Sequence, residues 1–153
     1  MTVRSGPAAR AKKVGPSAVA LVKCLGIKTT DVVKIAERLK KGLPFEALVR
    51  LRRRSGLSLE SISAVTQIPH RTLARRRAQG TLTPQESERL YRLALVLEKA
   101  VELFEGDITA ARHWLQAPNK AFADQSPLKL AETEIGAREV EDLIGRLEHG
   151  VIA

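Results

Sequence analysis

The residues with the clearest chemical potential are the arginines between positions 70 and 79, in the segment HRTLARRRAQ. Arg71, Arg75 and Gln79 are spaced by four, so a helix would carry them on one face. Thr72 and Arg76 flank that face. Guanidinium and amide groups in such a row suit hydrogen bonds to base edges or phosphates in the major groove of DNA. The spacing therefore predicts that these five residues contact double-stranded DNA.

A charged helix face exposed to solvent is the simpler explanation of the same pattern. Like charges this close repel one another within an isolated helix. Four arginines lie between Arg71 and Arg77, and no acidic residue stands in the same segment. An anionic partner would offset this repulsion, so we favour DNA contact over a solvated face.

Two short helices joined by a tight turn are predicted around these arginines. Ser58 is placed to cap the first helix, with Leu57 before it and Ile62 four residues later, at the spacing of a hydrophobic staple. Residues 66–69, TQIP, form the turn, and the second helix covers about residues 70–78. A helix-turn-helix presents its second helix to the major groove in this way.

Charge divides the chain into unlike halves. Residues 1–80 contain 18 Lys and Arg against 4 Asp and Glu, whereas residues 81–153 contain 8 against 13. The isoelectric point near 10.2 favours nucleic acid or an anionic membrane surface as partner. A membrane-surface helix would need Trp, Phe and Leu opposite its basic face, and the arginine-rich helix offers only Leu73. No apolar run has the length of a membrane span, so we expect a cytoplasmic chain without a membrane partner.

Catalytic and metal chemistry have little support. His70, His113 and His149 fall in three separate predicted helices, and none has a nucleophile or ligand set beside it. The lone Cys24 cannot form a disulfide framework, and its apolar neighbours indicate a small buried hydrophobe. No glycine-rich phosphate loop or paired metal motif is present. We expect no enzyme, no cofactor and no metal.

Apolar residues recur at spacings of three and four throughout, which predicts an all-α fold. We expect a flexible basic arm at 1–16, a helix-turn-helix domain at 17–80, a long connecting and dimerisation helix at 81–105, and a small helical domain with a C-terminal tail at 106–153. Capping signals predict further helices that begin after Ser17, Thr30, Asp107 and Ser126, one that begins at Pro44, and one over about Ala137–Glu148.

The long helix has the strongest start signal in the chain. Thr83 with Pro84 and Glu86 forms a capping box, and the helix should run to about Glu105. One apolar stripe follows it: Leu90, Leu93, Leu97, Val101 and Phe104. Such a stripe is either the core of a domain or the seam of a homodimer. We keep the homodimer seam as our hypothesis, because of the two alternatives it is the one that bears on function.

Two regions together resemble a known family. The first is RTLARR (71–76) followed by LTPQESERLYRLA (82–94), and the second is ARHWLQAPNKAF (111–122) followed by SPLKLAETEIGAREVEDLIGRLEHGV (126–151). Their specific elements are WL-x-x-PN, P-L-x-L, GA-x-x-V and HG. This arrangement resembles the Xre/MbcA/ParS-type antitoxins, the partners of RES-domain toxins, over about residues 40–153. The chain departs from the family at Ala123-Asp124, where a Gly pair is frequent.

The resemblance implies an N-terminal domain that binds operator DNA as a homodimer and represses its own operon. It implies a C-terminal domain that binds the toxin, an NAD⁺-degrading enzyme, and blocks the entrance to its active site. The residues that it puts at the toxin are Arg146, His149, Gly150, Val151, Ile152 and Ala153. An apolar chain end is also explained by a frayed terminus or a flap. The alternative function is a stand-alone dimeric repressor with an acidic dimerisation domain.

Overall fold

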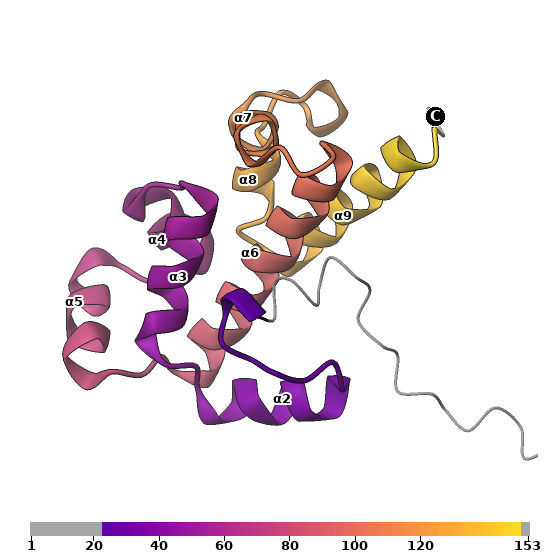
Figure 1. Cartoon of the computed structure of the whole chain (residues 1–153). Helices are drawn as coiled ribbons and strands as arrows, with labels where there is room; N and C mark the ends of the chain where they lie inside the picture. The colour runs from indigo at the N-terminus through magenta and orange to yellow at the C-terminus, as the bar shows by residue number, and fades with distance from the viewer. Residues whose placement is uncertain (1–22, 151–153) are drawn as a thin grey trace, which may run out of the picture.

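The computed structural model describes residues 23–150, and helices without any strand make up the regular structure of these residues (Figure 1). The expected all-α class is confirmed. The arm at 1–16, most of the helix expected after Ser17, and Val151–Ala153 lie outside the described residues. The helices are α2 (Val32–Lys41), α3 (Phe45–Ser55), α4 (Leu59–Thr66), α5 (His70–Gln79), α6 (Pro84–Leu103), α7 (Ile108–Gln116), the 3-10 turn η1 (Lys120–Phe122), α8 (Pro127–Leu130) and α9 (Glu134–Glu148).

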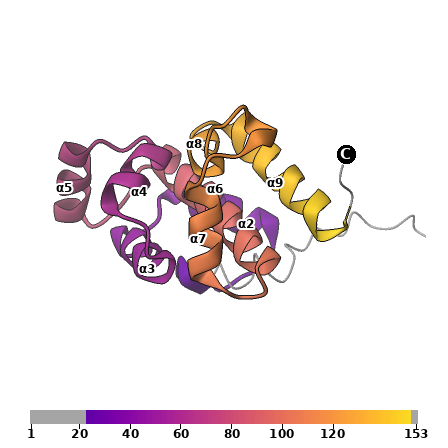
Figure 2. The same ribbon diagram turned by 90° about the horizontal axis from the view of Figure 1, so that it is seen from above.

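The long helix α6 is the centre of the molecule. It contacts α2, α3 and α4, which precede it in the sequence, and α7 and α9, which follow it. Figures 1 and 2 both show α5 at one end of the molecule and the C-terminal end of α9 at the opposite end. The two predicted binding surfaces therefore lie far apart on one helical scaffold. None of the described helices is both long and apolar enough to cross a membrane.

The start of α6 forms as its sequence predicts. The Thr83 side chain accepts a hydrogen bond from the Glu86 N–H, and the Glu86 carboxylate accepts one from the Thr83 N–H. The helix ends at Leu103, two residues earlier than expected. Gly106 follows with φ of +94°, a conformation that glycine adopts at little cost.

The apolar stripe of α6 belongs to the core of a single chain, which corrects its interpretation as a dimer seam. Leu90, Leu93 and Leu97 are at most 1% exposed, and Val101 is 9% exposed. Phe104 is half-buried, and its ring lies 6.3 Å from that of Trp114. Because neighbouring helices of the same chain already cover the four aliphatic side chains, these have almost no surface left for a second copy, and only Phe104 at the end of the stripe keeps some exposed surface.

Two helix starts differ from the prediction. The cap of α2 is Asp31 rather than Thr30, because the Asp31 carboxylate accepts a hydrogen bond from the Val33 N–H. Helix α9 begins at Glu134 rather than Ala137, with Thr133 as its cap. Its first turn was missed because Ile135 is 78% exposed and does not follow the apolar period of the rest of the helix.

Backbone hydrogen bonds tie the turn before α3 to the turn after α5. The Phe45 N–H donates to the Gly80 carbonyl at 2.9 Å, and the Leu82 N–H donates to the Leu43 carbonyl at 2.8 Å. The Leu43 N–H donates to Ser87 Oγ on α6, inside the core. A Cβ on Gly42 would overlap the Leu82 carbonyl, so glycine is required there. The C-terminal end of α5 is thereby held against the start of α6.

Candidate functional site

The turn between α4 and α5 is closed by several local hydrogen bonds. Ser58 caps α4 through the Ser61 N–H, as expected. Gln67 adopts the left-handed conformation, with φ of +57°, and its side chain donates to the Ala64 carbonyl at 2.6 Å. Ser63 bonds Ile68 in both directions, through its hydroxyl and its carbonyl. These bonds fix the angle at which α5 leaves the turn.

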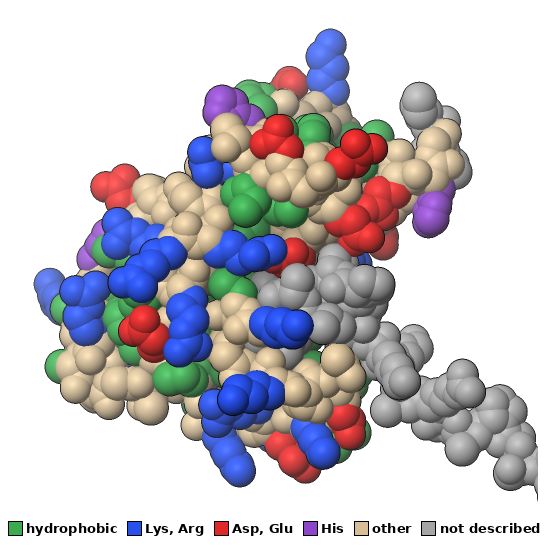
Figure 3. All heavy atoms as spheres, viewed as in Figure 1, with side chains coloured by type: hydrophobic (Ala, Val, Ile, Leu, Met, Phe, Trp, Pro, Cys, Tyr) green, Lys and Arg blue, Asp and Glu red, His purple; other side chains and the backbone are tan. Residues whose placement is uncertain are grey.

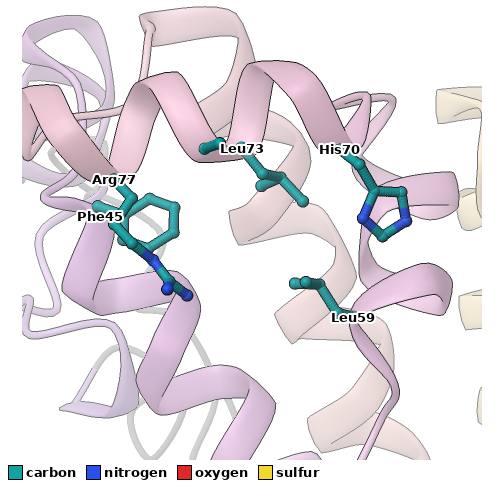
Figure 4. Close-up of a pocket in the computed structure, with 6 residues that line it drawn as sticks. Phe45, Leu59, His70, Leu73 and Arg77 are labelled. Carbon is teal, nitrogen blue, oxygen red and sulfur yellow. The ribbon is translucent and has the colours of Figure 1, made fainter.

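Helix α5 has little apolar anchoring. Leu73 is its one buried residue, all of α5 being described, and it is 4% exposed. At the edge of this contact the Arg77 guanidinium stands over the Phe45 ring, 5.5 Å from its centre (Figure 4). Leu59 and His70 complete a shallow apolar hollow with these three residues. A cation over a ring adds attraction that a bare apolar contact lacks, so Arg77 helps to hold α5 although its side chain is exposed.

The outer face of α5 carries unpaired cations. Arg71 and Arg75 are exposed, and no acidic side chain among residues 23–150 forms an ion pair with either. Gln79 is also exposed, and Thr72 is half-buried. Figure 3 shows Lys and Arg gathered over α2, α3 and α5, while Asp and Glu gather over the half that contains α7 to α9. On the face that Figure 3 shows, the charge division of the sequence is therefore also a division of the surface.

Arg76 is held differently from its neighbours. Its Nε donates to Glu86 Oε1 at 2.7 Å, and its side chain is 15% exposed. The sequence reasoning missed this partner because Glu86 stands beyond a turn, ten residues away, and no periodicity connects the two. Burial opposes ionisation of Glu86, but hydrogen bonds from Arg76 and Thr83 outweigh it, and the pKa of Glu86 lies below its usual value. Arg76 thus joins the predicted DNA face to the core.

A second acid on α6 binds a second arginine. Glu98, buried at 4% exposure, accepts a hydrogen bond from Arg54 Nε of α3 at 2.6 Å. Arg112 of α7 donates to the Ser55 carbonyl at 3.0 Å, directly beneath the end of α3. These two contacts link the helix-turn-helix half to the C-terminal half. Arg54 and Arg112 therefore both have structural partners within the chain.

Helix α9 packs on α6 and α8, and small buried residues lie at its start. A Cβ on Gly136 would overlap the Leu130 carbonyl, and Ala137 and Val140 are at most 1% exposed. The GA-x-x-V pattern is therefore a packing motif. Lys99 of α6 and Glu141 of α9 add a hydrogen-bonded ion pair at 3.3 Å.

The end of α9 is open to solvent. Arg146, His149 and Gly150 are exposed, as a binding surface requires, while Ile144 is buried. Leu147 continues the apolar spacing of Val140 and Ile144 but is 40% exposed. The remaining predicted contacts, Val151, Ile152 and Ala153, lie outside the described residues.

The loop before α8 keeps a backbone suited to glycine. Ala123 and Asp124 both have positive φ, +53° and +65°. Asn119 holds the loop by accepting a hydrogen bond at its side chain from the Ala121 N–H, and at its carbonyl from the Asp124 N–H. A glycine pair would fit this backbone without strain. Ala123-Asp124 therefore differs from the family pattern in its side chains, while its backbone keeps the conformation that glycine favours.

The described part of the chain offers no metal-binding group, and its one cysteine is poorly placed for nucleophilic chemistry. Residues 23–150 contain no group of three His, Cys, Asp or Glu side chains that could hold a metal ion. Cys24 is half-buried, and burial raises the pKa of its thiol. A thiol with a raised pKa is a poor nucleophile.

Two family models match adjacent parts of the chain. A family model described as the antitoxin Xre-like helix-turn-helix domain matches residues 34–95. A second, described as the antitoxin Xre/MbcA/ParS C-terminal toxin-binding domain, matches residues 99–150. An "Antitoxin Xre" of Yersinia enterocolitica is 39% identical over 135 residues, covering 88% of this chain and 91% of that protein. This chain belongs to the Xre antitoxin family.

Two further relatives support the membership. "Antitoxin Xre" of Photorhabdus laumondii is 34% identical over 75% of this chain and 78% of that protein. "Antitoxin Xre" of Pseudomonas putida is 30% identical over 76% of this chain and 72% of that protein. Since these relatives are antitoxins, a family of binding proteins, the chain is an antitoxin and no enzyme. The two family matches meet within α6, the helix that both halves share.

Proposed function

We propose that this antitoxin neutralises an NAD⁺-degrading RES-domain toxin and represses its own operon by binding operator DNA as a homodimer. The observation that carries the proposal is the pairing of two unlike surfaces on one scaffold: a cationic helix-turn-helix and, at the far end, a toxin-binding domain of the Xre type. The RES identity of the toxin is proposed on the family resemblance alone.

The DNA-binding part of the proposal is supported by the free cations of α5. Arg71 and Arg75 would meet phosphates or guanine edges, with Thr72 and Gln79 beside them. Two copies would hold their recognition helices about 34 Å apart, one turn of DNA, and would read a palindrome. Binding that depends on phosphate contacts must weaken steeply as salt rises.

The toxin-binding part is supported by the exposed end of α9. Arg146, His149 and Gly150 would contact the toxin together with Val151–Ala153. This end lies opposite α5 (Figure 2), so toxin and DNA could be bound by the same molecule at once.

The test is the cellular NAD⁺ concentration while the adjacent open reading frame is induced. NAD⁺ should collapse without this chain and be preserved by the intact chain, and deletion of His149–Ala153 should abolish protection. The matched control is Arg75→Ala, which should protect NAD⁺ fully but bind operator DNA about tenfold more weakly. If NAD⁺ never falls, the partner is not a RES toxin. The stand-alone dimeric repressor then becomes the better proposal.

A further inference from the structure

Two charged residues, Arg76 and Glu86, orient the side chain of Gln79 through successive hydrogen bonds. Arg76 donates through Nε to Glu86 and through Nη1 to Gln79 Oε1, at 2.7 Å and 3.1 Å. Glu86 is itself fixed, because the same carboxylate oxygen accepts the Thr83 N–H in the capping box. The series runs from the buried Glu86 through the largely buried Arg76 to the exposed Gln79.

The direction of these bonds decides which end of the Gln79 amide is free. A guanidinium has donors only, so the atom of Gln79 that faces Arg76 must be the carbonyl oxygen. The amide NH₂ then points away from Arg76. Gln79 is exposed at the C-terminal end of α5, on the side that carries Arg75. It is therefore presented to a ligand as a hydrogen-bond donor.

We propose that Glu86 and Arg76 are positioning residues that set which base Gln79 reads. A free glutamine pairs best with adenine, because it donates to N7 and accepts from N6 at the same time. With its oxygen held by Arg76, Gln79 cannot turn both ends toward one adenine. Its NH₂ instead meets an edge that offers acceptors, and guanine offers two, O6 and N7. Gln79 thus specifies guanine in preference to adenine.

This inference rests on the proposed DNA binding and is tested by selection of bound duplexes from a pool with a randomised central region. We expect the wild-type chain to enrich a palindrome in which one position per half-site depends on Gln79. The variant Gln79→Ala identifies that position by losing its preference there. Wild type should favour guanine over adenine at that position by about three- to tenfold, the range that one hydrogen bond supports.

Glu86→Gln is the decisive variant. Glutamine can still cap α6, but it no longer fixes Arg76 by charge, so the guanine preference at the Gln79 position should vanish or shift toward adenine. The double variant Arg76→Met, Glu86→Gln removes both partners without leaving a buried charge alone, and should give the same base profile. Arg76→Lys, which keeps a donor-only side chain, should retain the preference for guanine.

Glu98→Gln is the matched control, since Glu98 is a buried acid on the same helix that also holds an arginine. It should lower stability while leaving the base profile unchanged. An adenine preference at the Gln79 position in wild type overturns the inference, as does an unchanged profile in both Glu86 variants or a Gln79→Ala profile identical to wild type. If the wild-type chain enriches no sequence at all, the proposed DNA reading itself fails.

Discussion

Helices α5 and α9, one from each half of the antitoxin, show two ways to present a binding surface. Helix α5 buries one residue, Leu73, and is otherwise held by Arg76 on Glu86, by Arg77 on Phe45 and by backbone bonds at Gly80. Helix α9 is held mainly by apolar packing, with four buried residues: Gly136, Ala137, Val140 and Ile144.

The difference follows from the charge that each helix carries. A helix with four arginines has few positions left for apolar anchors, so part of its cationic character is used to attach it to the core. The acidic half has no such constraint and can bury a regular apolar stripe. Mutations in the two helices should therefore fail in different ways.

The largest effect is expected where α5 has no substitute anchor. Leu73→Ala should lower the free energy of unfolding by about 3 kcal/mol, because it removes the one buried side chain of the helix and leaves a cavity. The matched control is Leu147→Ala in α9, which should cost less than about 1 kcal/mol, since Leu147 is 40% exposed. Urea denaturation followed by circular dichroism measures both. Equal losses would mean that α5 is anchored mainly by its polar contacts.

Gly136 should be the most sensitive position of α9. Gly136→Ala puts a Cβ against the Leu130 backbone and should cost about 2–3 kcal/mol. Gly145→Ala in the same helix meets nothing within 4 Å and should stabilise the chain by about 0.5–1 kcal/mol, because alanine is the better helix former. Thermal unfolding followed by Trp114 fluorescence compares the two. A tolerated Gly136→Ala would contradict the packing account of the GA-x-x-V pattern.

Glu86 should make the attachment of α5 sensitive to pH. Its folded pKa lies below the usual 4.5, so its contribution is complete above that pH and is lost as pH falls through the folded pKa. Glu86→Gln should cost about 2 kcal/mol at neutral pH, as expected for a hydrogen bond between charged groups, and should reduce the loss of stability in acid. Urea midpoints measured on both sides of pH 4.5 test this. Parallel pH profiles for the variant and wild type would argue against it.

Arg75 should affect binding without affecting the fold. It is exposed and has no acidic partner among the described residues, so Arg75→Ala should leave the melting temperature unchanged. Operator affinity should fall about tenfold. If Arg75 contacts a phosphate, the slope of log affinity against log salt concentration should also become shallower by about one. Titration of labelled duplex at several salt concentrations measures both. Unchanged affinity would exclude this face of α5 as the DNA-binding surface.

The smallest effects are expected at two left-handed residues, one in each half. Ala123→Gly should stabilise the chain by about 1 kcal/mol, because it relieves a positive φ of 53°. Gln67→Gly relieves a similar strain but loses the side-chain bond to the Ala64 carbonyl, so its gain should be smaller. Chemical denaturation resolves the difference. Equal gains would mean that the Gln67 bond contributes nothing.

Local signals in the sequence were sufficient for much of the fold. The capping box of Thr83 and Glu86, the Ser58 cap, and Gly80 after the second helix depend on residues within a few positions of one another. Such signals can be recognised without knowledge of the tertiary structure, because the backbone N–H and C=O groups that they pair belong to the same helix end. The predicted start of α9 was wrong, because Ile135 is an apolar residue left in solvent and does not follow the apolar period of the helix.

By itself, then, the sequence determined the helical class, most helix ends, the segregation of charge and the family. The tertiary structure alone decided which arginines are free, because Glu86 and Glu98, the partners of Arg76 and Arg54, lie on another helix and meet these arginines only in the folded chain. It also decided that the α6 stripe is core rather than seam. A helix period shows that a stripe is buried, but only the packed neighbours show by what.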